Sequence, residues 1–435
     1  MPRPAPSIEE RRSCGKALRE RLHRTGQSIF SRSPGFDLVA TLLQSAEGRL
    51  PELLPVKWRR MAASPFGFFR GAVPVMAADL ANSPRTGITV QMCGDAHVRN
   101  LGAYAAPDGR LIFDLNDFDE TMPGPWEWDV KRLAASLMIA GREAGESETR
   151  CMEAVRTLVS SYRAVMQECS AMTVLELARY QVHRNLVMMA ARKVVEKAER
   201  DTPQQMLAKL TLVKNGARRF KREKPLLWPV SRAAEQAVLR ALESYRKTLS
   251  PERLHFLNRY RPEAVAFKIV GTGSVGTRDY AVLHTARPDD PLFLQVKEEP
   301  PPAYARHLPA RLPRHNGRRV VEGQRLMQAQ SDIFLGWTSI EGRDYLVRQL
   351  HDHKAAIDPN ELKGAALEDF ARLCGEILAK GHARSGDPCV VAGYCGSSAR
   401  LDVAIATFSA SYADQNEKDH KTFCAALRAG KFRRR

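Results

Sequence analysis

The spacing of apolar residues changes twice along the chain, and this pattern limits the folds that are possible. From Trp126 to about residue 250 the apolar residues recur at helical spacing. Between 263 and 350 the chain instead has short runs of β-branched and aromatic residues, typical of strands, with one helix at 318–330. Helical spacing returns at 367–384 and 406–430. This order predicts an α+β protein in which one small sheet lies among many helices.

The same order divides the 435 residues into four parts. Residues 1–60 form a basic, partly helical leader, and residues 61–250 contain a polar hairpin and a mainly helical large lobe. Residues 251–355 form a small antiparallel-sheet lobe with a glycine-rich loop, and residues 356–435 return to the large lobe as helices. We therefore expect two lobes, of which the larger is mainly helical.

The charge balance indicates a class of ligand without identifying one. Lysine and arginine together number 67, against 49 aspartates and glutamates, which gives a formal net charge of +18. Such a field attracts nucleotides, phosphorylated metabolites, nucleic acids and acidic lipid head groups alike. The ligand therefore has to be inferred from motifs.

The cysteines and the hydropathy pattern favour a cytoplasmic protein. The 8 cysteines are scattered and contain no C-x-x-C pair, so we expect reduced thiols rather than disulfides or a structural zinc site. Residues 1–20 lack the apolar core of a secretory signal. No apolar stretch reaches the roughly eighteen residues that a membrane span needs, so we expect no membrane-spanning segment.

The densest group of polar residues lies in two segments, CGDAHVRN at 93–100 and FDLNDFDE at 113–120. The dipeptide Asp108-Gly109 between them favours a two-residue type I′ turn, which would place Asn100 directly opposite Asp117. Facing residues have Cβ atoms about 5 Å apart. Because Mg²⁺ prefers a few such oxygen ligands together with phosphate and water, we predict that Asn100 and Asp117 share one Mg²⁺ ion.

A proton acceptor is expected beside this metal site. Asp95 lies in the entering loop, where its carboxylate would be free to accept a proton, and His97 would either hydrogen-bond within the loop or pack as a structural residue. Asp114 or Asp119 would replace Asp117 if the register slips. Asp and Asn residues also gather in loops because they cap helices and form turns, which is the alternative to a functional role.

A second motif is the glycine-rich segment VGTGSVGTRDYAVL, with Gly271, Gly273 and Gly276 in G-x-G-x-x-G order. A dinucleotide-binding fingerprint needs a helix after the glycines, but the residues that follow read as a strand. A strand–glycine loop–strand arrangement is typical of protein kinases, in which the loop covers the ATP phosphates. Lys297 lies in the following apolar strand, and Glu322 on the next helix is its expected ion-pair partner; the alternative is that both are surface charges.

These motifs resemble those of aminoglycoside-phosphotransferase-type kinases, which read roughly H-G-D-x-H-x-x-N and then I-D-F-G. The resemblance implies a two-lobed protein-kinase-like fold with ATP and Mg²⁺ as cofactors. It also implies roles for the matching residues: Asp95 and His97 as catalytic residues, Asn100 and Asp117 as metal ligands, Asp129 as a structural aspartate, and Gly271, Gly273, Ser274, Gly276, Lys297 and Glu322 in nucleotide binding.

A closer resemblance covers roughly residues 50–425. SPFGFFRG, GDAHVRN, NDFDE, GTGSVGTRDY, LQVKE and GHARSGD are similar to segments of an uncharacterised bacterial family, the domain of unknown function numbered 2252. Two features depart from the kinase pattern. Cys93 stands where the motif usually begins with His, and the glycine loop follows the catalytic loop instead of preceding it. We interpret this order as a circular permutation in which the helix at 367–384 leads into the catalytic loop; a coincidental glycine loop is the alternative.

The resemblance implies an ATP- and Mg²⁺-dependent phosphotransferase that acts on a small-molecule hydroxyl acceptor. The alternatives are a transferase that moves AMP onto a protein, a catalytically silent nucleotide-binding scaffold, and a nucleic-acid-binding protein. The last would use the basic runs at 217–224, 311–319 and the KFRRR tail, but none of these runs belongs to a recognised nucleic-acid-reading module. The expected partners are therefore a nucleotide and an unidentified acceptor.

This reading requires two distant parts of the chain to close on one cleft, with Lys297 near Asp117. Arg70 in FGFFRG would contact an anionic acceptor or anchor its own segment. The residues of GHARSGD would cap a helix or line the cleft; they include His382, Arg384 and Asp387.

Overall fold

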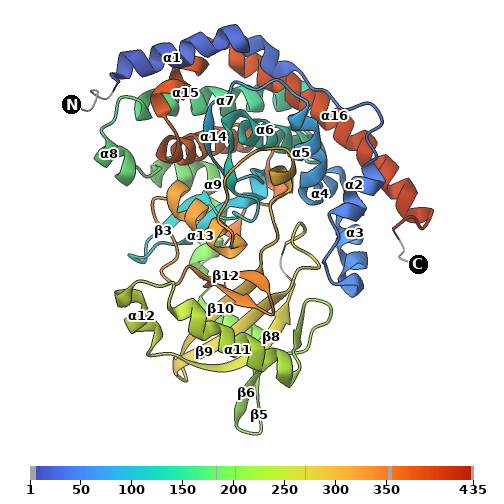
Figure 1. Ribbon diagram of the computed structural model, residues 1–435, viewed down its shortest axis with the longest axis vertical. Helices are drawn as coiled ribbons and strands as arrows, with labels where there is room; N and C mark the ends of the chain where they lie inside the picture. The colour runs from blue at the N-terminus through green and yellow to red at the C-terminus, as the bar shows by residue number, and fades with distance from the viewer. Residues whose placement is uncertain (1–5, 183, 201, 270, 351–354, 433–435) are drawn as a thin grey trace.

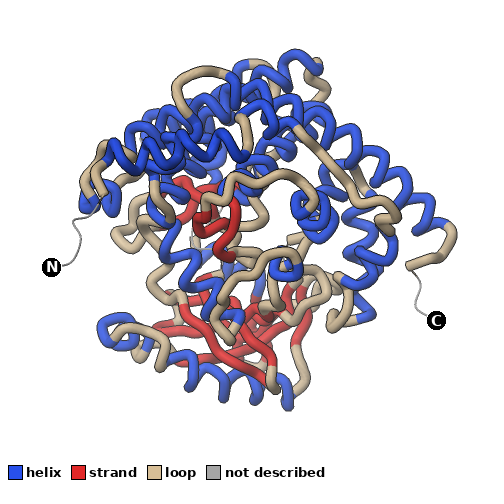
Figure 2. The backbone as a smooth tube through the Cα atoms, turned by 45° about the horizontal axis from the view of Figure 1, so that its top comes forward, coloured by secondary structure: helices blue, strands red, loops and turns tan. Residues whose placement is uncertain are grey.

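The computed structural model describes residues 6–182, 184–200, 202–269, 271–350 and 355–432. Its helices and antiparallel sheets make it a mixed α+β protein. Most helices form one lobe, and the largest sheet lies in the other (Figure 1). A smaller group of strands lies within the helical lobe, on the side that faces the sheet (Figure 2).

The large lobe is built around α6 (Trp126–Glu143), which is buried along almost its whole length. The long helices α7 (Glu148–Cys169), α14 (Ala365–Ser385) and α16 (Arg400–Arg428) pack against it. A helix surrounded on every side is usually apolar all round, yet α6 also buries charged residues such as Asp129 and Arg132. Because buried charges need partners, these two residues indicate where the lobe carries a polar site.

Shorter elements complete this lobe: α1 (Ile8–Arg21), α2 (Leu38–Gln44), α3 (Leu54–Ala62), α4 (Pro65–Gly71), α5 (Val73–Ala81), α8 (Val174–Arg179), α9 (Arg184–Arg200), α15 (Pro388–Cys395), the pair β1 (Thr89–Met92) and β4 (Met122–Pro125), and the sheet β13 (Ala355–Ala356)–β2 (Leu101–Ala105)–β3 (Leu111–Leu115). The leader packs against the end of the chain, since Trp58 of α3 contacts Phe423 of α16. Within the described ranges, no helix combines the length and the apolar composition that crossing a membrane requires.

The small lobe is a six-stranded antiparallel sheet with strand order β11–β12–β10–β9–β8–β7. Side chains alternate between its faces, so Val282 packs under α11 while its neighbour Leu283 packs under α10. The elements of this lobe are α10 (Pro203–Leu210), β5 (Thr211–Lys214), β6 (Ala217–Phe220), β7 (Leu227–Pro229), α11 (Arg232–Arg246), α12 (Pro251–Leu257), β8 (Arg261–Lys268), β9 (Asp279–Arg287), β10 (Asp290–Glu298), α13 (Asn316–Met327), β11 (Gly336–Ile340) and β12 (Arg343–Gln349).

The small lobe begins earlier than the sequence predicted. The helical spacing of their apolar residues places residues 203–250 in the helical lobe, but α10 and α11 pack on opposite faces of the sheet. Helical spacing reports that one face of a helix is buried without reporting what covers it. The boundary therefore lies near residue 203 rather than near 250.

The β2–β3 hairpin differs from the prediction by one residue in register. Leu101 faces Leu115, so the position opposite Asn100 is taken by Asn116, whose backbone N–H donates to the Asn100 carbonyl at 3.0 Å. The cause is a three-residue loop closed by Ala106 and Arg110 instead of a two-residue turn. The prediction that Asn100 lies directly opposite Asp117 is therefore wrong.

Candidate active site

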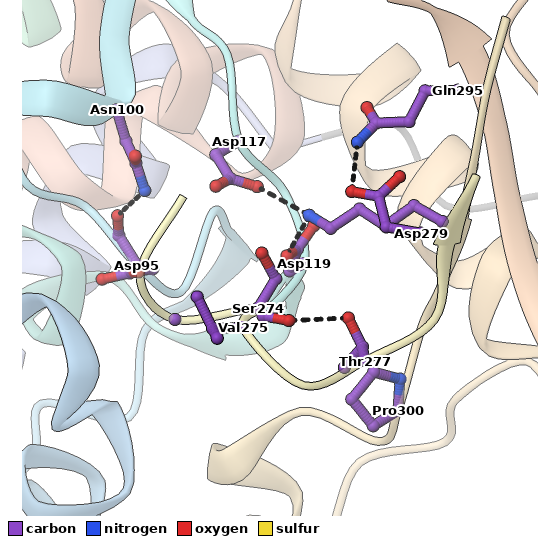
Figure 3. A network of polar contacts seen from close by, with 12 residues as sticks. Asp95, Asn100, Asp117, Asp119, Ser274, Val275, Thr277, Asp279, Gln295 and Pro300 are labelled. Carbon is purple, nitrogen blue, oxygen red and sulfur yellow. Dashed lines mark hydrogen bonds and ion pairs between the residues drawn. The ribbon is translucent and has the colours of Figure 1, made fainter. Parts of the chain in front are cut away.

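A cleft lies where the two lobes meet. Its walls come from the loop at 93–100, the segment at 117–120, the end of α4 and the glycine loop between β8 and β9. The lining residues that were singled out from the sequence are Arg70, Asp95, His97, Asn100, Asp117, Asp119, Gly271, Gly273 and Ser274. Figure 3 shows Asp95, Asn100, Asp117 and Asp119 facing the loop that carries Ser274.

Lys297 joins the two sequence-distant halves. Its Nζ donates to Asp119 Oδ2 and lies 3.9 Å from Asp117 Oδ1. Although burial lowers the pKa of this lysine, the carboxylates of Asp119 and Asp117 raise it overall. In turn, although burial opposes ionisation of Asp119, Lys297 lowers the pKa of that carboxyl to about 2. The expected proximity of Lys297 and Asp117 is confirmed, and Asp119 is the closer partner.

The carboxylates beside Lys297 fit a divalent cation. Asp117 Oδ1, Asp119 Oδ1 and both oxygens of Glu299 are buried and accept no hydrogen bond. Burial and the repulsion from Asp119 raise the pKa of Asp117, as expected where negative charge exceeds the available donors. In the described part of the chain no three His, Cys, Asp or Glu side chains converge as a ready-made metal site. Mg²⁺ would therefore take its remaining ligands from an amide oxygen, phosphate and water.

Asn100 still lines the cleft despite the shifted register, because it lies at the end of the short helical turn Val98–Asn100. Its side-chain Nδ2 donates to the backbone carbonyl of Asp95 at 2.9 Å. This hydrogen bond fixes the amide group and leaves its oxygen as a candidate ligand beside Asp117. Asn100 and Asp117 thus line the same cleft because of the conformation of the 93–100 loop, and not because the two strands pair them.

Asp95 is held by Arg132, a residue of α6 that the sequence analysis did not identify. Arg132 Nε donates to Asp95 Oδ1 at 2.7 Å, and the guanidinium also lies over the ring of Phe69, 4.4 Å from its centroid. Burial raises the pKa of Asp95 even though Arg132 lowers it. The result is an oriented carboxylate with enhanced basicity, which is what a proton acceptor needs.

His97 is a neutral, packed residue next to this carboxylate. It is buried, its ring packs against Phe66, and its Nε2 lies 3.7 Å from Asp95 Oδ2. Burial and the nearby charges of Arg70 and Arg132 shift the pKa of His97 well below its usual value. An uncharged imidazole can support the loop, but it does not carry a positive charge at neutral pH.

The loop that carries Asp95 is fixed from beneath by Asp129. The backbone N–H groups of Cys93 and Gly94 donate to the Asp129 carboxylate at 2.7 and 3.0 Å. Gly94 has a φ of +83°, and a Cβ at this position would lie 2.2 Å from the carbonyl oxygen of Glu120. Asp129 also contacts His382 Nε2 at 3.2 Å. These contacts support the role of Asp129 as a structural aspartate.

The glycine loop is tied to the large lobe by residues 49–60, which we call the strap. Arg49 Nη1 donates to the carbonyl oxygens of Gly273 and Val275, both at 2.8 Å, and Lys57 Nζ donates to Gly273 O at 3.0 Å. Arg60 bonds to the carbonyl of Gly271. Basic side chains of the leader thus donate hydrogen bonds to the carbonyl groups of the glycine loop.

Glu322 does not pair with Lys297, so that part of the prediction is wrong. Its carboxylate accepts a 2.6 Å hydrogen bond from Arg318 on the outside of α13. The face of α13 that meets the site presents Arg319, which donates to the backbone carbonyls of Asp119 and Thr121, and Gly323 one turn later. Because successive helical residues are turned by about 100°, Glu322 faces away when Gly323 faces inward.

Two other open alternatives are resolved by contacts outside the cleft. Asp114 forms a buried ion pair with Lys380 and does not replace Asp117. In GHARSGD, Asp387 caps α15 through the N–H of Cys389, Arg384 donates to the carbonyl of Ala178, and His382 supports Asp129. These three residues are therefore structural.

The functional residues that sequence reasoning missed are Arg49, Lys57 and Arg132. Each is a cation whose partner lies far away in the chain, so no local spacing marks it. Their only sequence signal is a charge among apolar neighbours, such as Arg132 in VKRLAASL. Many solvent-facing residues give the same signal.

A search of curated proteins and a search of solved structures each returned no match. One family model matches residues 49–426, and its description reads "Uncharacterized protein conserved in bacteria (DUF2252)". The matched region starts at Arg49 of the strap and includes the cleft residues discussed above. Because the match covers most of the chain, the protein belongs to the DUF2252 family of uncharacterised bacterial proteins.

Proposed function

We propose that this protein is an ATP- and Mg²⁺-dependent phosphotransferase of kinase-like fold that acts on a hydroxyl group of a small molecule. The observation that carries the proposal is the ion-pair cluster of Lys297, Asp117 and Asp119 beneath the glycine loop, with Asp95 in the same cleft. A nucleotide-binding half and a catalytic half need to meet in this way for phosphoryl transfer, which depends mainly on positioning and charge neutralisation.

The order of elements in the small lobe supports the kinase-like assignment. The glycine loop joins β8 and β9, Lys297 lies on the next strand, β10, and the helix α13 follows. Protein kinases likewise have a glycine-rich loop over the phosphates and a lysine on the third strand. The departure is that Asp119, and not a glutamate of the helix, is the close partner of this lysine.

Contacts at the end of α14 support a circular permutation. The backbone N–H of Gln91 donates to Ser385 Oγ at 3.3 Å, so the end of α14 lies beside the strand that leads into the 93–100 loop. A direct connection at this point would place the catalytic loop after the small lobe and α14, which is the kinase order. Such a rearrangement is tolerated where the joined ends are close in space.

Each residue of the cleft has a specific task in this mechanism. Lys297 would bind phosphate oxygens, and Asp117, Asp119 and the amide oxygen of Asn100 would hold Mg²⁺, which neutralises phosphate charge when bound. Asp95, oriented by Arg132, would accept the proton of the acceptor hydroxyl.

Thermal unfolding with and without Mg·ATP tests the proposal. Ligand at about 100 times its dissociation constant should stabilise the wild-type protein by about 2.7 kcal/mol. Lys297→Met should remove most of this effect, whereas Lys193→Met, at an exposed position on α9, should retain it. Absence of a shift with millimolar Mg·ATP would contradict ATP binding. If ATP binds, γ-labelled and α-labelled ATP distinguish phosphate transfer from AMP transfer, and a silent scaffold would transfer neither label.

A further inference from the structure

Three arginines gather near the loop that carries Asp95 and His97. The charges of Arg70, Arg132 and Arg99 all act on the ring of His97. Arg132 is engaged by Asp95. Within the described part of the chain, neither Arg70 nor Arg99 forms an ion pair, and Arg70 Nε is buried without a hydrogen-bond partner.

Arg70 differs in this respect from the other cations of the cleft. Lys297 is bonded to Asp119, and Arg49 and Lys57 are bonded to carbonyls of the glycine loop. Arg70 lines the same cleft, mostly buried, and its pKa is lowered to about 10 by burial and by Arg99, so it stays charged at neutral pH. Its Nε is buried without a hydrogen-bond partner, which is costly for a charged group, and a bound anion would offset that cost.

The guanidinium of Arg70 is not needed to anchor its own segment. The helix α4 is held by its buried residues Phe66, Phe68 and Phe69, and by a 2.9 Å hydrogen bond from Asn416 Nδ2 to the carbonyl of Pro65. The close approach of Gly71 to Met61 fixes the end of the helix. The helix therefore positions Arg70, and its side chain remains available to a ligand.

The position of Arg70 places that ligand next to Asp95. Arg132 donates both to Asp95 Oδ1 at 2.7 Å and to the backbone carbonyl of Phe69 at 3.2 Å, so Arg70, the next residue, lies close to the proposed proton acceptor. The backbone carbonyl of Arg70 in turn lies against Gly273 of the glycine loop. An acceptor whose hydroxyl group meets Asp95 would have its remaining atoms near Arg70.

We propose that Arg70, with Arg99 near it, binds an anionic group of the acceptor, so that the substrate is a hydroxyl compound with a phosphate or carboxylate group. A planar guanidinium suits both anions because each can accept two parallel hydrogen bonds. This inference rests on the proposed phosphotransferase function, since that function makes Asp95 the residue that meets the acceptor hydroxyl.

The test uses inorganic phosphate and acetate as probes, titrated in separate calorimetric experiments at constant ionic strength. The protein is first saturated with Mg²⁺ and the non-hydrolysable imido analogue of ATP, so that the nucleotide phosphate sites are filled. We expect the preferred anion to bind at least tenfold more weakly to Arg70→Gln than to wild type. Arg70→Lys should be intermediate, and Arg110→Gln, which alters an exposed arginine of the β2–β3 hairpin, should equal wild type. The stronger of the two probes identifies the anion class.

Several results would overturn the inference. It fails if neither anion binds the nucleotide-saturated protein, or if Arg70→Gln binds both as wild type does. It also fails, with the phosphotransferase proposal intact, if Arg70→Gln weakens binding of the imido analogue by the same factor, because Arg70 would then serve the nucleotide. If wild type does not bind the analogue at all, the proposed function itself fails. Should Arg70→Gln not fold, Arg99→Gln, at an exposed position, is expected to weaken anion binding at least threefold.

Discussion

Replacing Arg132 with methionine would remove the charged partner of Asp95. Arg132 is fully buried in α6, its Nε donates to Asp95 Oδ1 at 2.7 Å, and the two side chains form an ion pair. Methionine fills much of the same space but offers no positive charge. The substitution therefore leaves Asp95 buried without its counter-charge and tests whether this pair orients the proton acceptor.

The expected cost depends on pH, and its sign follows from the pKa of Asp95. Breaking a buried ion pair by removing one partner costs about 3–5 kcal/mol. Burial already raises the pKa of Asp95 above its usual 3.8, so the free energy of unfolding falls as pH rises from 3.8 through the folded-state pKa. Removing Arg132 raises that pKa further. The variant should therefore lose more stability at pH 8 than at pH 5.

Urea unfolding of the large lobe, followed by fluorescence of the buried Trp126 and Trp128 beside the pair, measures this loss at both pH values. Adding Asp95→Asn to Arg132→Met should reduce the loss at pH 8 and remove its pH dependence, because a neutral amide needs no counter-charge. Arg110→Met serves as the exposed control. A loss within about 0.5 kcal/mol, as for surface substitutions, or an equal loss at both pH values would refute the reasoning.

Two further substitutions separate cleft residues from surface residues. Asp117→Asn should weaken ATP binding at least tenfold, about 1.4 kcal/mol, when Mg²⁺ is present, because the Asp117 carboxylate is assigned to the metal. In excess chelator the same substitution should change ATP binding little. Equal effects in both titrations would contradict that assignment. Glu322→Gln should change the dissociation constant of Mg·ATP by less than about twofold, because Glu322 pairs with Arg318 at the surface and exposed ion pairs of this kind add little stability. A larger loss of Mg·ATP affinity in the same titration would restore Glu322 to the nucleotide site.

The β2–β3 hairpin shows why register is difficult to predict from a turn dipeptide. Asp108-Gly109 favours a type I′ turn, which needs positive φ at both residues, but only Gly109 has one, at +79°. Pro107 precedes the pair, and its fixed φ favours the second position of a type I turn, which the hydrogen bond from Gly109 N to Ala106 O closes. In contrast, Asn215-Gly216 between β5 and β6 has positive φ at both residues. The proline therefore decides the register.

The motif residues and the missed residues differ in how their roles are encoded. Asp95, Asp117 and the glycines lie in short segments whose residue types already suit their chemistry, so the cleft was predictable. The position of Lys297 near Asp117 was also predictable, but its closest partner was not, because helix rotation decides which side chain of α13 faces inward. Arg132 acts only through tertiary contact with Asp95. Charges whose partners are distant in the sequence leave no periodic signal.

The contacts of the strap give part of the basic leader a structural role. A trans peptide places its C=O and N–H on opposite sides, so when Gly271, Gly273 and Val275 turn their carbonyls toward the strap, the amides that follow them point away from it. The cations at 49–60 thereby fix the orientation of alternate N–H groups, the groups that a glycine loop offers to phosphates. Part of the positive charge of this chain is thus used inside the protein to set a loop. For this reason, the net charge of +18 is weaker support for an external polyanion than it first suggests.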